Sequence, residues 1–191
     1  MKKPLIVMYD SGLDRLEKQS IECAINIAYD TICYKRGIIR YGSSAQIGPL
    51  SWTADDAVGG LPLDNHGGIR AADLLTKIEN NHLITLFFTS LPFSDCKYGM
   101  TNEFATVQTV FPYRGSFLSS DDRMIAIKGV FWYELGRILG LADDDDICRN
   151  SGCIMHCKDR DFLKGLIACA REAQYTGVYC QNCQRKIKES A

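Results

Sequence analysis

The chain has 191 residues, of which 46% are hydrophobic and 24% are charged, and its formal net charge at pH 7 is -1. This length and apolar content suffice for one substantial core. The balanced charge excludes a general attraction to nucleic acid or to anionic membranes, and no apolar run approaches the roughly 18 to 20 residues that span a bilayer. Because the first residues do not resemble a signal peptide, we expect a soluble, cytoplasmic protein.

The first half of the chain alternates between strand and helix patterns. An apolar run at 5–9 predicts a strand, and apolar residues at helical spacing predict a long amphipathic helix over 12–33. A second strand is expected at 36–41. Residues 42–68 are rich in Gly and lack periodicity, which predicts a long loop, and a second helix is expected over 67–80.

The second half carries two contrasting strand patterns. Residues 83–89 form a continuous apolar run, which is typical of a central strand buried on both faces. Residues 104–113 alternate between polar and apolar, which predicts an edge strand. A helix is expected at 121–139, where two Asp begin an apolar face and a Gly ends it. Another helix at about 159–173 precedes a hairpin that holds two closely spaced Cys at 180–183.

The order of these elements predicts an α/β sandwich with a mixed, twisted sheet. We expect a single domain over residues 1–191. Residues 1–140 would form the sheet and its helices, and residues 141–191 would form a turn, a C-terminal helix and a cysteine-rich appendage.

Four of the nine cysteines have the spacing of metal ligands. Cys148-x4-Cys153 and Cys180-x2-Cys183 are two short-spaced pairs that can supply four thiolates to one tetrahedral ion. A closed set of four thiolates favours structural zinc, with a redox dithiol and unligated thiols as the alternatives. The remaining cysteines stand singly and are interpreted as reduced, small hydrophobic side chains: Cys23, Cys33, Cys96, Cys157 and Cys169.

A second motif has the spacing of a catalytic zinc site without its ligands. Zinc peptidases of the metzincin type carry HExxHxxGxxH, in which three His bind zinc and the Glu acts as general base. Here Glu134 keeps the place of the base, while Tyr133, Arg137 and Asp143 stand where the three His would be. A guanidinium cannot coordinate zinc and a phenol is a poor substitute for imidazole, so Asp143 alone does not make a site.

Together these motifs resemble the archaemetzincins, whose signature is HExxHxxGxxHC-x4-C-x-M followed by CxxC. The resemblance spans about 83–185 and adds Cys153-Ile-Met155 to the residues above. It implies a metzincin-like sandwich with a long active-site helix, a structural zinc on the four cysteines, and Met155 in a Met-turn beneath the active site. It also implies that Glu134 is a vestigial general base. Four extra residues at 144–147 depart from the family pattern.

The vacated catalytic position needs another occupant. Our hypothesis is that the positive charge of Arg137 lies there and pairs with Asp143, with Tyr133 hydrogen-bonded beside it. The competing interpretation is an ordinary helix-surface ion pair between Arg137 and Glu134. His156 follows the Met-turn and is interpreted as a solvated or hydrogen-bonded side chain, with a place in the cleft as the alternative.

Three functions are open at this point. One is a catalytically inactive archaemetzincin-like protein that keeps its cleft to bind an extended peptide or protein segment along the edge strand at 104–112. Another is a metallopeptidase or hydrolase with a noncanonical metal site built from Glu134 and Asp143. The third is a structural or regulatory subunit. Without a catalytic zinc there is no bound water of lowered pKa, so we expect no ordinary peptidase activity.

The acidic run at 143–146 follows the predicted helix end, where the helix dipole disfavours negative charge. A solvated loop is the simplest interpretation. Neutralisation by a nearby Arg or Lys, or by a bound calcium or magnesium ion, is the alternative. One zinc ion per chain would favour the inactive protein, and a second metal ion would favour the noncanonical enzyme.

Overall fold

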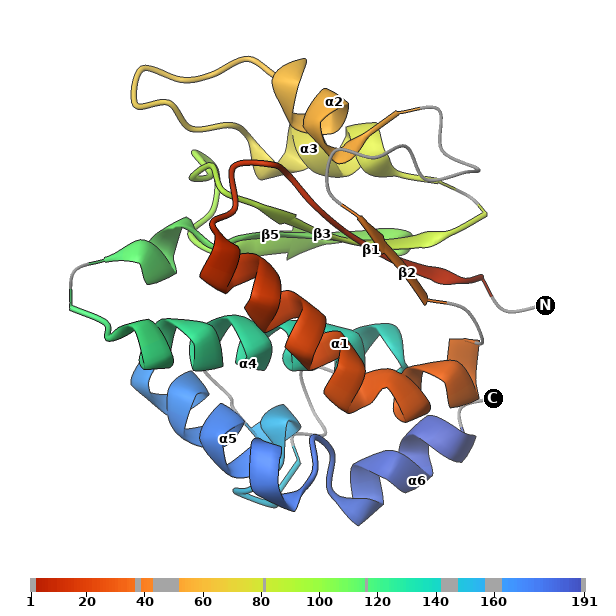
Figure 1. The fold of residues 1–191 in the computed structure, drawn as a ribbon. Helices are drawn as coiled ribbons and strands as arrows, with labels where there is room; N and C mark the ends of the chain where they lie inside the picture. The colour runs from red at the N-terminus through yellow and green to blue at the C-terminus, as the bar shows by residue number, and fades with distance from the viewer. Residues whose placement is uncertain are drawn as a thin grey trace. The chain divides into compact units, whose positions relative to one another are not determined.

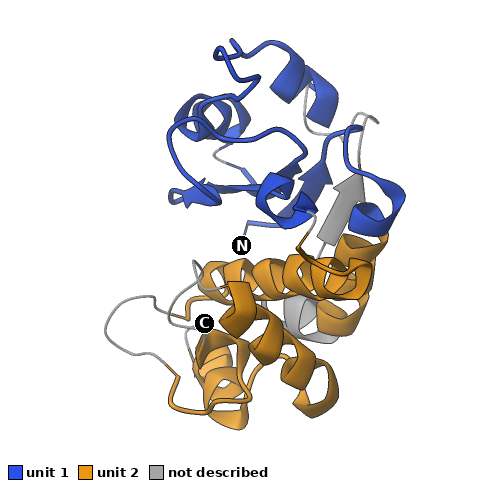
Figure 2. Ribbon diagram, turned by 90° about the vertical axis from the view of Figure 1, so that its left-hand side faces the viewer, with its two compact units in different colours: residues 1–18, 36–116 blue, residues 19–35, 117–191 orange. Residues whose placement is uncertain are grey.

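The computed structural model describes residues 3–36, 39–42, 52–80, 82–115, 117–141, 148–156 and 163–189, with side chains left out at 30–42. These residues group into two compact units, shown in Figure 2. Unit 1 comprises Met1–Lys18 and Arg36–Ser116, and unit 2 comprises Gln19–Lys35 and Phe117–Ala191. The prediction of one domain divided at residue 140 stays a prediction. Each unit is described below by itself.

In the described part of unit 1, five strands form one sheet in the order β2-β1-β3-β5-β4 (Figure 1). The strands are β1 (Leu5–Tyr9), β2 (Ile39–Gly42), β3 (Ile84–Thr89), β4 (Gly99–Thr101) and β5 (Ala105–Thr109). Strands β2, β1, β3 and β5 pair in parallel, and β4 pairs with β5 in antiparallel fashion. The mixed sheet is thus confirmed, and β3, the continuous apolar run, lies at its centre as predicted.

The edge strand was predicted in the wrong place. Strand β5 lies between β3 and β4, and all five of its residues are buried, including the polar Thr106 and Gln108. The edge is β4, a three-residue strand that carries no periodic pattern. At its first position a side chain larger than that of Gly99 would clash with the carbonyl oxygen of Val107, so β4 approaches β5 closely only because it starts with Gly.

Helices α2 (Ala54–Gly59) and α3 (Ala71–Ile78) and the 3-10 helix η1 (Phe111–Arg114) accompany the sheet in the described part of unit 1, and α2 lies inside the predicted loop. Its start is set by a capping box: the Asp56 amide donates to Thr53 Oγ1 at 3.1 Å, and the Thr53 amide donates to Asp56 Oδ2 at 2.9 Å. Helix α3 starts later than predicted. The carboxylate of Asp95 caps it by accepting from the first helical amide, that of Ala71, at 2.7 Å.

A buried ion pair lies where α1 (Arg15–Arg36) begins. Glu17 is fully buried, and Arg114 donates to both of its carboxylate oxygens at 2.7 Å. The same guanidinium donates to the carbonyl oxygen of Gly12 at 2.9 Å. Hydrogen bonding to Glu17 raises the pKa of Arg114. These bonds offset the cost of burying the Glu17 carboxylate and hold α1 to the turn after β1.

Helices make up the described part of unit 2. Besides residues 19–35 of α1, they are α4 (Ser120–Ile138), the short 3-10 turn η2 (Ile154–His156), α5 (Leu163–Thr176) and α6 (Gln181–Glu189). Helix α4 begins at the cap Ser119, whose hydroxyl accepts from the Asp122 amide at 3.1 Å, and Gly140 follows its end with a φ of 93°. Every residue of α4 from Ile125 to Gly136 is buried, so this helix is the core of unit 2.

The last element differs from its prediction. Cys180 and Cys183 were expected in a hairpin, but Cys183 lies in the first turn of α6 and Cys180 directly precedes that helix. Helix α6 buries Cys183 and Ile187 and exposes Arg185 and Lys188. The sequence did not predict this helix, because its apolar face consists of only two residues and gives no helical periodicity.

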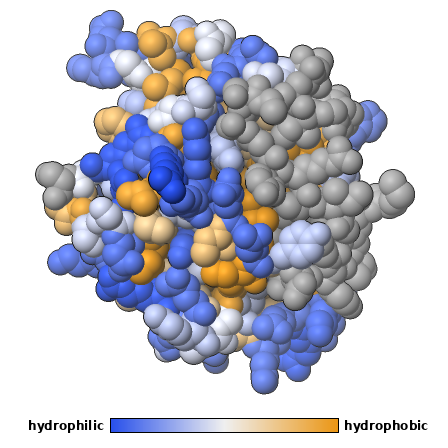
Figure 3. Space-filling model, viewed as in Figure 1, coloured by the Kyte–Doolittle hydropathy of each residue, from blue (hydrophilic) through white to orange (hydrophobic). Residues whose placement is uncertain are grey.

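The described helices include none that is long and apolar enough to span a bilayer. In the view of Figure 3 most of the described surface is hydrophilic, and hydrophobic residues emerge mainly near the middle of the face and at its top.

Candidate metal centre and the neighbouring helix

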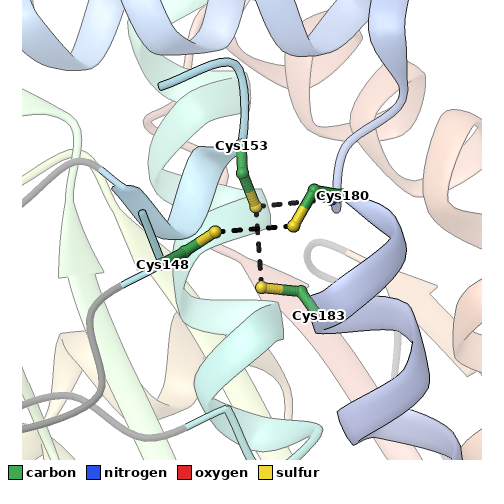
Figure 4. A group of neighbouring side chains, drawn as sticks. All are labelled: Cys148, Cys153, Cys180 and Cys183. Atoms are coloured by element: carbon green, nitrogen blue, oxygen red, sulfur yellow. Dashed lines mark hydrogen bonds between the residues drawn. The ribbon is translucent and has the colours of Figure 1, made fainter. Parts of the chain in front are cut away.

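The four paired cysteines converge in unit 2, as Figure 4 shows. Cys148 and Cys153 come from the segment directly before η2. Cys180 directly precedes α6, and Cys183 lies in its first turn. Their Sγ atoms all lie within 4.8 Å of one another. The sulfurs of Cys148 and Cys180 are 3.4 Å apart, and those of Cys153 and Cys183 are 3.7 Å apart.

These distances fit a tetrahedral metal ion. A zinc ion with four thiolates at about 2.3 Å places each pair of sulfurs about 3.8 Å apart. All four cysteines are free thiols, and three of them are buried. The cluster could therefore hold a metal ion with soft ligands and without large movement of its side chains.

The cluster holds its sulfurs in unequal protonation states. The hydrogen bond between Cys153 and Cys183 lowers the pKa of Cys153 to about 5 and raises that of Cys183. The backbone amide of Cys180 also donates to Cys153, at 3.4 Å. Burial raises the pKa of Cys148 to about 11. The metal-free cluster thus concentrates negative charge on one sulfur, and a bound cation would displace protons from the others.

One histidine lies beside the cluster. Nδ1 of His156 is 2.6 Å from the carbonyl oxygen of Cys148, and because that oxygen can only accept, Nδ1 carries the hydrogen. The His156 amide donates to the carbonyl oxygen of Cys153 at 2.8 Å. The interpretation of His156 as a hydrogen-bonded side chain is confirmed. The other two histidines, His66 and His82, are exposed in unit 1.

The degenerate motif lies on α4. Glu134 is fully buried and Tyr133 is buried, and the side chain of Arg137 is 23% exposed. Arg137 Nη1 donates to Glu134 Oε2 at 3.1 Å, so the competing Arg137–Glu134 pair is present. The competing interpretation of an ordinary surface pair is wrong in one respect, because the Glu134 side chain is fully buried. Asp143 and the acidic run at 143–146 lie outside the described residues, so the Arg137–Asp143 pair stays a prediction.

Met155 packs against the same helix. It lies in η2, and a side chain at Gly136 of α4 would clash with Met155 Sδ. The turn that holds Met155 therefore approaches α4 next to Arg137, as a Met-turn would require. Its functional role stays a prediction.

Sequence reasoning missed Tyr179, the residue before Cys180. Its side chain is 2% exposed, and its hydroxyl donates to the carbonyl oxygen of Trp132 at 2.7 Å. Burial raises the pKa of Tyr179 well above its ordinary value, so the phenol remains a donor. Two features of the sequence could have indicated its role. Tyr179 is an aromatic residue next to a metal-ligand pair, and Gly136 inside a predicted helix suggests that another side chain packs closely there.

The fold and the site define a mixed α/β protein with a four-cysteine cluster that could hold a metal ion. Among solved structures, the archaemetzincin from Methanopyrus kandleri is similar, with a TM-score of 0.62 over 98% of this chain and 94% of that chain. The two sequences are 12% identical, so the likeness establishes the archaemetzincin fold and not a shared activity. No family model and no curated protein matches this sequence.

Proposed function

We propose that this chain is a zinc-binding protein with an archaemetzincin fold that does not hydrolyse peptides and instead binds an extended peptide. The observation that carries this proposal is the pair of Arg137 with the buried Glu134. In a metzincin the Glu deprotonates a water held by zinc on the neighbouring His residues. Here a permanent cation faces that carboxylate, and it repels the metal ion that the reaction needs.

Zinc is the ion that best fits the cysteine cluster. Four thiolates close the coordination sphere, so the ion would have no open position for water or substrate. Its function would be to join the segment at 148–153 to the start of α6, and thus to stabilise unit 2.

The peptide would bind at the edge of the sheet in unit 1. We move the predicted site from 104–112 to β4, because β5 is covered on both sides within the described sheet. Strand β4 (Gly99–Thr101) is the outermost strand on that side, and its outward backbone groups can pair with an added strand. Its three residues are half-buried, so its backbone is accessible to a peptide. The strand is too short to promote edge-to-edge aggregation.

The test restores the missing imidazoles. The triple variant Tyr133→His, Arg137→His and Asp143→His recreates HExxHxxGxxH around Glu134. We expect the triple variant to bind one more zinc ion per chain than the parent protein. A chelator-sensitive peptidase activity in the parent protein itself would overturn the proposal. A matched variant, Lys164→His with Tyr175→His, places two histidines about three helical turns apart on exposed positions of α5, too far apart to share one ion, and should bind no additional zinc.

Peptide binding is tested separately on β4. In the β4–β5 register Met100 is a hydrogen-bonded partner of Val107. The outward backbone groups of β4 therefore belong to Gly99 and Thr101. A proline at Thr101 removes an outward amide. We expect Thr101→Pro to abolish capture of peptides from a library of extended sequences, with Leu63→Pro, in an exposed segment of unit 1, as the control. Equal capture by both variants would exclude β4 as the site.

A further inference from the structure

Tyr179 connects the four-cysteine cluster to α4. The residue immediately precedes the ligand candidate Cys180, and its side chain extends into the core of unit 2. There its hydroxyl donates to the carbonyl oxygen of Trp132 at 2.7 Å. Trp132 is the residue before Tyr133, so this hydrogen bond reaches α4 where the degenerate motif begins.

The backbone of Tyr179 is also fixed from the cluster side. Its carbonyl oxygen accepts from Nε2 of Gln184 in α6 at 2.8 Å. The next amide, that of Cys180, donates to Sγ of Cys153 at 3.4 Å. A metal ion bound to Cys153 and Cys180 would therefore restrain the backbone directly after Tyr179.

Trp132 carries the connection one step further. Its indole nitrogen donates to the carbonyl oxygen of Ala24 in α1 at 3.0 Å. Both Trp132 and Tyr179 are among the largest fully buried side chains of the protein. Two buried hydrogen bonds thus link the start of α6 to α4 and α4 to α1, all within unit 2.

The Tyr179 ring packs closely against α4 at Gly136. A Cβ atom at Gly136 would lie 3.1 Å from Cε1 of Tyr179 and would clash with Met155 Sδ. The Tyr179 ring and the Met155 thioether therefore share the single gap that Gly136 opens on α4. Arg137 follows Gly136 directly. A displacement of the Tyr179 ring or of the Met155 side chain would therefore shift the backbone that carries the Glu134–Arg137 pair.

We propose that Tyr179 is a positioning residue that couples metal binding at the four-cysteine cluster to the local stability of α4 around Glu134 and Arg137. With the metal bound, the segments at 148–153 and 180–183 are cross-linked, and the phenol is held against the Trp132 carbonyl. Without the metal, these segments gain freedom, the hydrogen bond opens more often, and α4 exchanges its amides faster. The inference rests on metal binding by the cluster and is independent of peptide binding.

The chain offers a direct reporter of this coupling. It contains two Trp residues, and the variant Trp52→Phe leaves Trp132 as the only one. We would add zinc to the metal-free Trp52→Phe protein and follow Trp132 fluorescence, bound zinc and amide exchange together. We expect a change in Trp132 emission and at least about tenfold slower exchange in the α4 amides at 133–137. Exchange in β3 of unit 1 serves as the internal reference.

The decisive variant is Tyr179→Phe, which keeps the ring and removes the hydroxyl. We expect it to bind zinc in the same ratio as its parent while zinc slows α4 exchange less than about twofold. Its matched control is Tyr175→Phe, because Tyr175 is 89% exposed on α5. This control should retain the full response.

A second variant keeps the test valid if Tyr179→Phe fails to fold. Gly136→Ala leaves Tyr179 intact and forces Met155 and the phenol ring away from α4, so it should also lose the response. A full zinc response in the Tyr179→Phe or Gly136→Ala protein would overturn the proposal. So would equal slowing of β3 and α4, which would mean that zinc stabilises the whole chain uniformly. Failure of the parent to bind zinc would overturn the premise of metal binding, and the zinc measurement identifies that case directly.

Discussion

The four-cysteine cluster and the Tyr133–Arg137 segment of α4 lie in the same unit and have opposite chemistry. The cluster gathers soft, ionisable sulfurs within 4.8 Å, which a cation stabilises. The helix segment presents a guanidinium paired to a buried carboxylate, which a cation destabilises. The difference teaches that two groups of side chains in one unit respond to a cation in opposite ways, so that a site able to hold a metal ion and a site that repels one can be tested separately.

The largest effect is expected from breaking the cluster. Cys183→Ser removes one buried ligand, and structural zinc sites of this kind contribute on the order of 10 kcal/mol to folding of their segment. We expect loss of stoichiometric zinc and a strongly lowered melting temperature, measured by elemental analysis and calorimetry. Cys169→Ser, a partly buried thiol on α5 outside the cluster, is the control and should keep its zinc. Equal zinc content in the two variants would contradict the assigned ligand set.

A smaller effect is expected from breaking the ion pair on α4. Arg137→Met removes the positive charge 3.1 Å from the buried Glu134 carboxylate and should cost about 3 kcal/mol of unfolding free energy, measured in urea. The double variant with Glu134→Gln should recover most of that loss, because it removes the buried negative charge as well. The control Arg171→Met breaks an exposed pair with Asp121 and Asp122 and should cost less than about 1 kcal/mol. Similar losses in Arg137→Met and Arg171→Met would show that the Glu134 pair is no more than a surface contact.

The protonation of the metal-free cluster gives a pH dependence of defined sign. The pKa of Cys153 is lowered from 9.0 to about 5, mainly by its hydrogen bond with Cys183. Its thiolate therefore stabilises the metal-free fold fully above pH 9.0, and that contribution is lost as the pH falls through about 5. Thiolate absorbance near 240 nm should show one sulfur titrating in the acid range, and Cys153→Ser should remove that step. A titration in which every thiol ionises in the alkaline range would contradict the hydrogen-bond arrangement.

The smallest effect is expected beside the cluster. His156→Phe removes the donor to the Cys148 carbonyl while it keeps a planar ring, and loss of such a supporting bond typically weakens metal binding by about tenfold. Competition with a chromophoric chelator measures the affinity. The control His82→Phe changes an exposed histidine of unit 1 and should leave the metal affinity unchanged. An affinity unaffected by His156→Phe would mean that the Cys148 carbonyl is positioned by the backbone alone.

Local patterns explain which parts of the fold could be predicted. The apolar run of β3 and the short spacings of the cysteine pairs are properties of a few neighbouring residues, so both the central strand and the cluster were found in the sequence. The box of Thr53 and Asp56 was equally local, but α2 is too short to show periodicity. Strand β4 gave no signal, because three residues that start with Gly carry neither alternation nor bulk.

The chemistry around α4 depended on distant segments. Glu134 becomes a buried charge only because α4 is covered along its whole middle, and sequence spacing alone describes the Glu134–Arg137 pair as a surface pair. The hydrogen bond from Tyr179 to Trp132 joins residues 47 positions apart. Neither burial nor such a long-range bond is a property of local spacing, which is why Tyr179 was missed.

The number of zinc ions per chain tests the central claim most directly. Native mass spectrometry of the purified protein, with a peptidase assay on the same sample, counts the metal and measures the chemistry together. We predict one zinc ion per chain, none in Cys183→Ser, and no chelator-sensitive hydrolysis. A second zinc ion that persists in Cys183→Ser and accompanies hydrolysis would contradict the account, because it would place a catalytic metal beside Glu134 and Arg137.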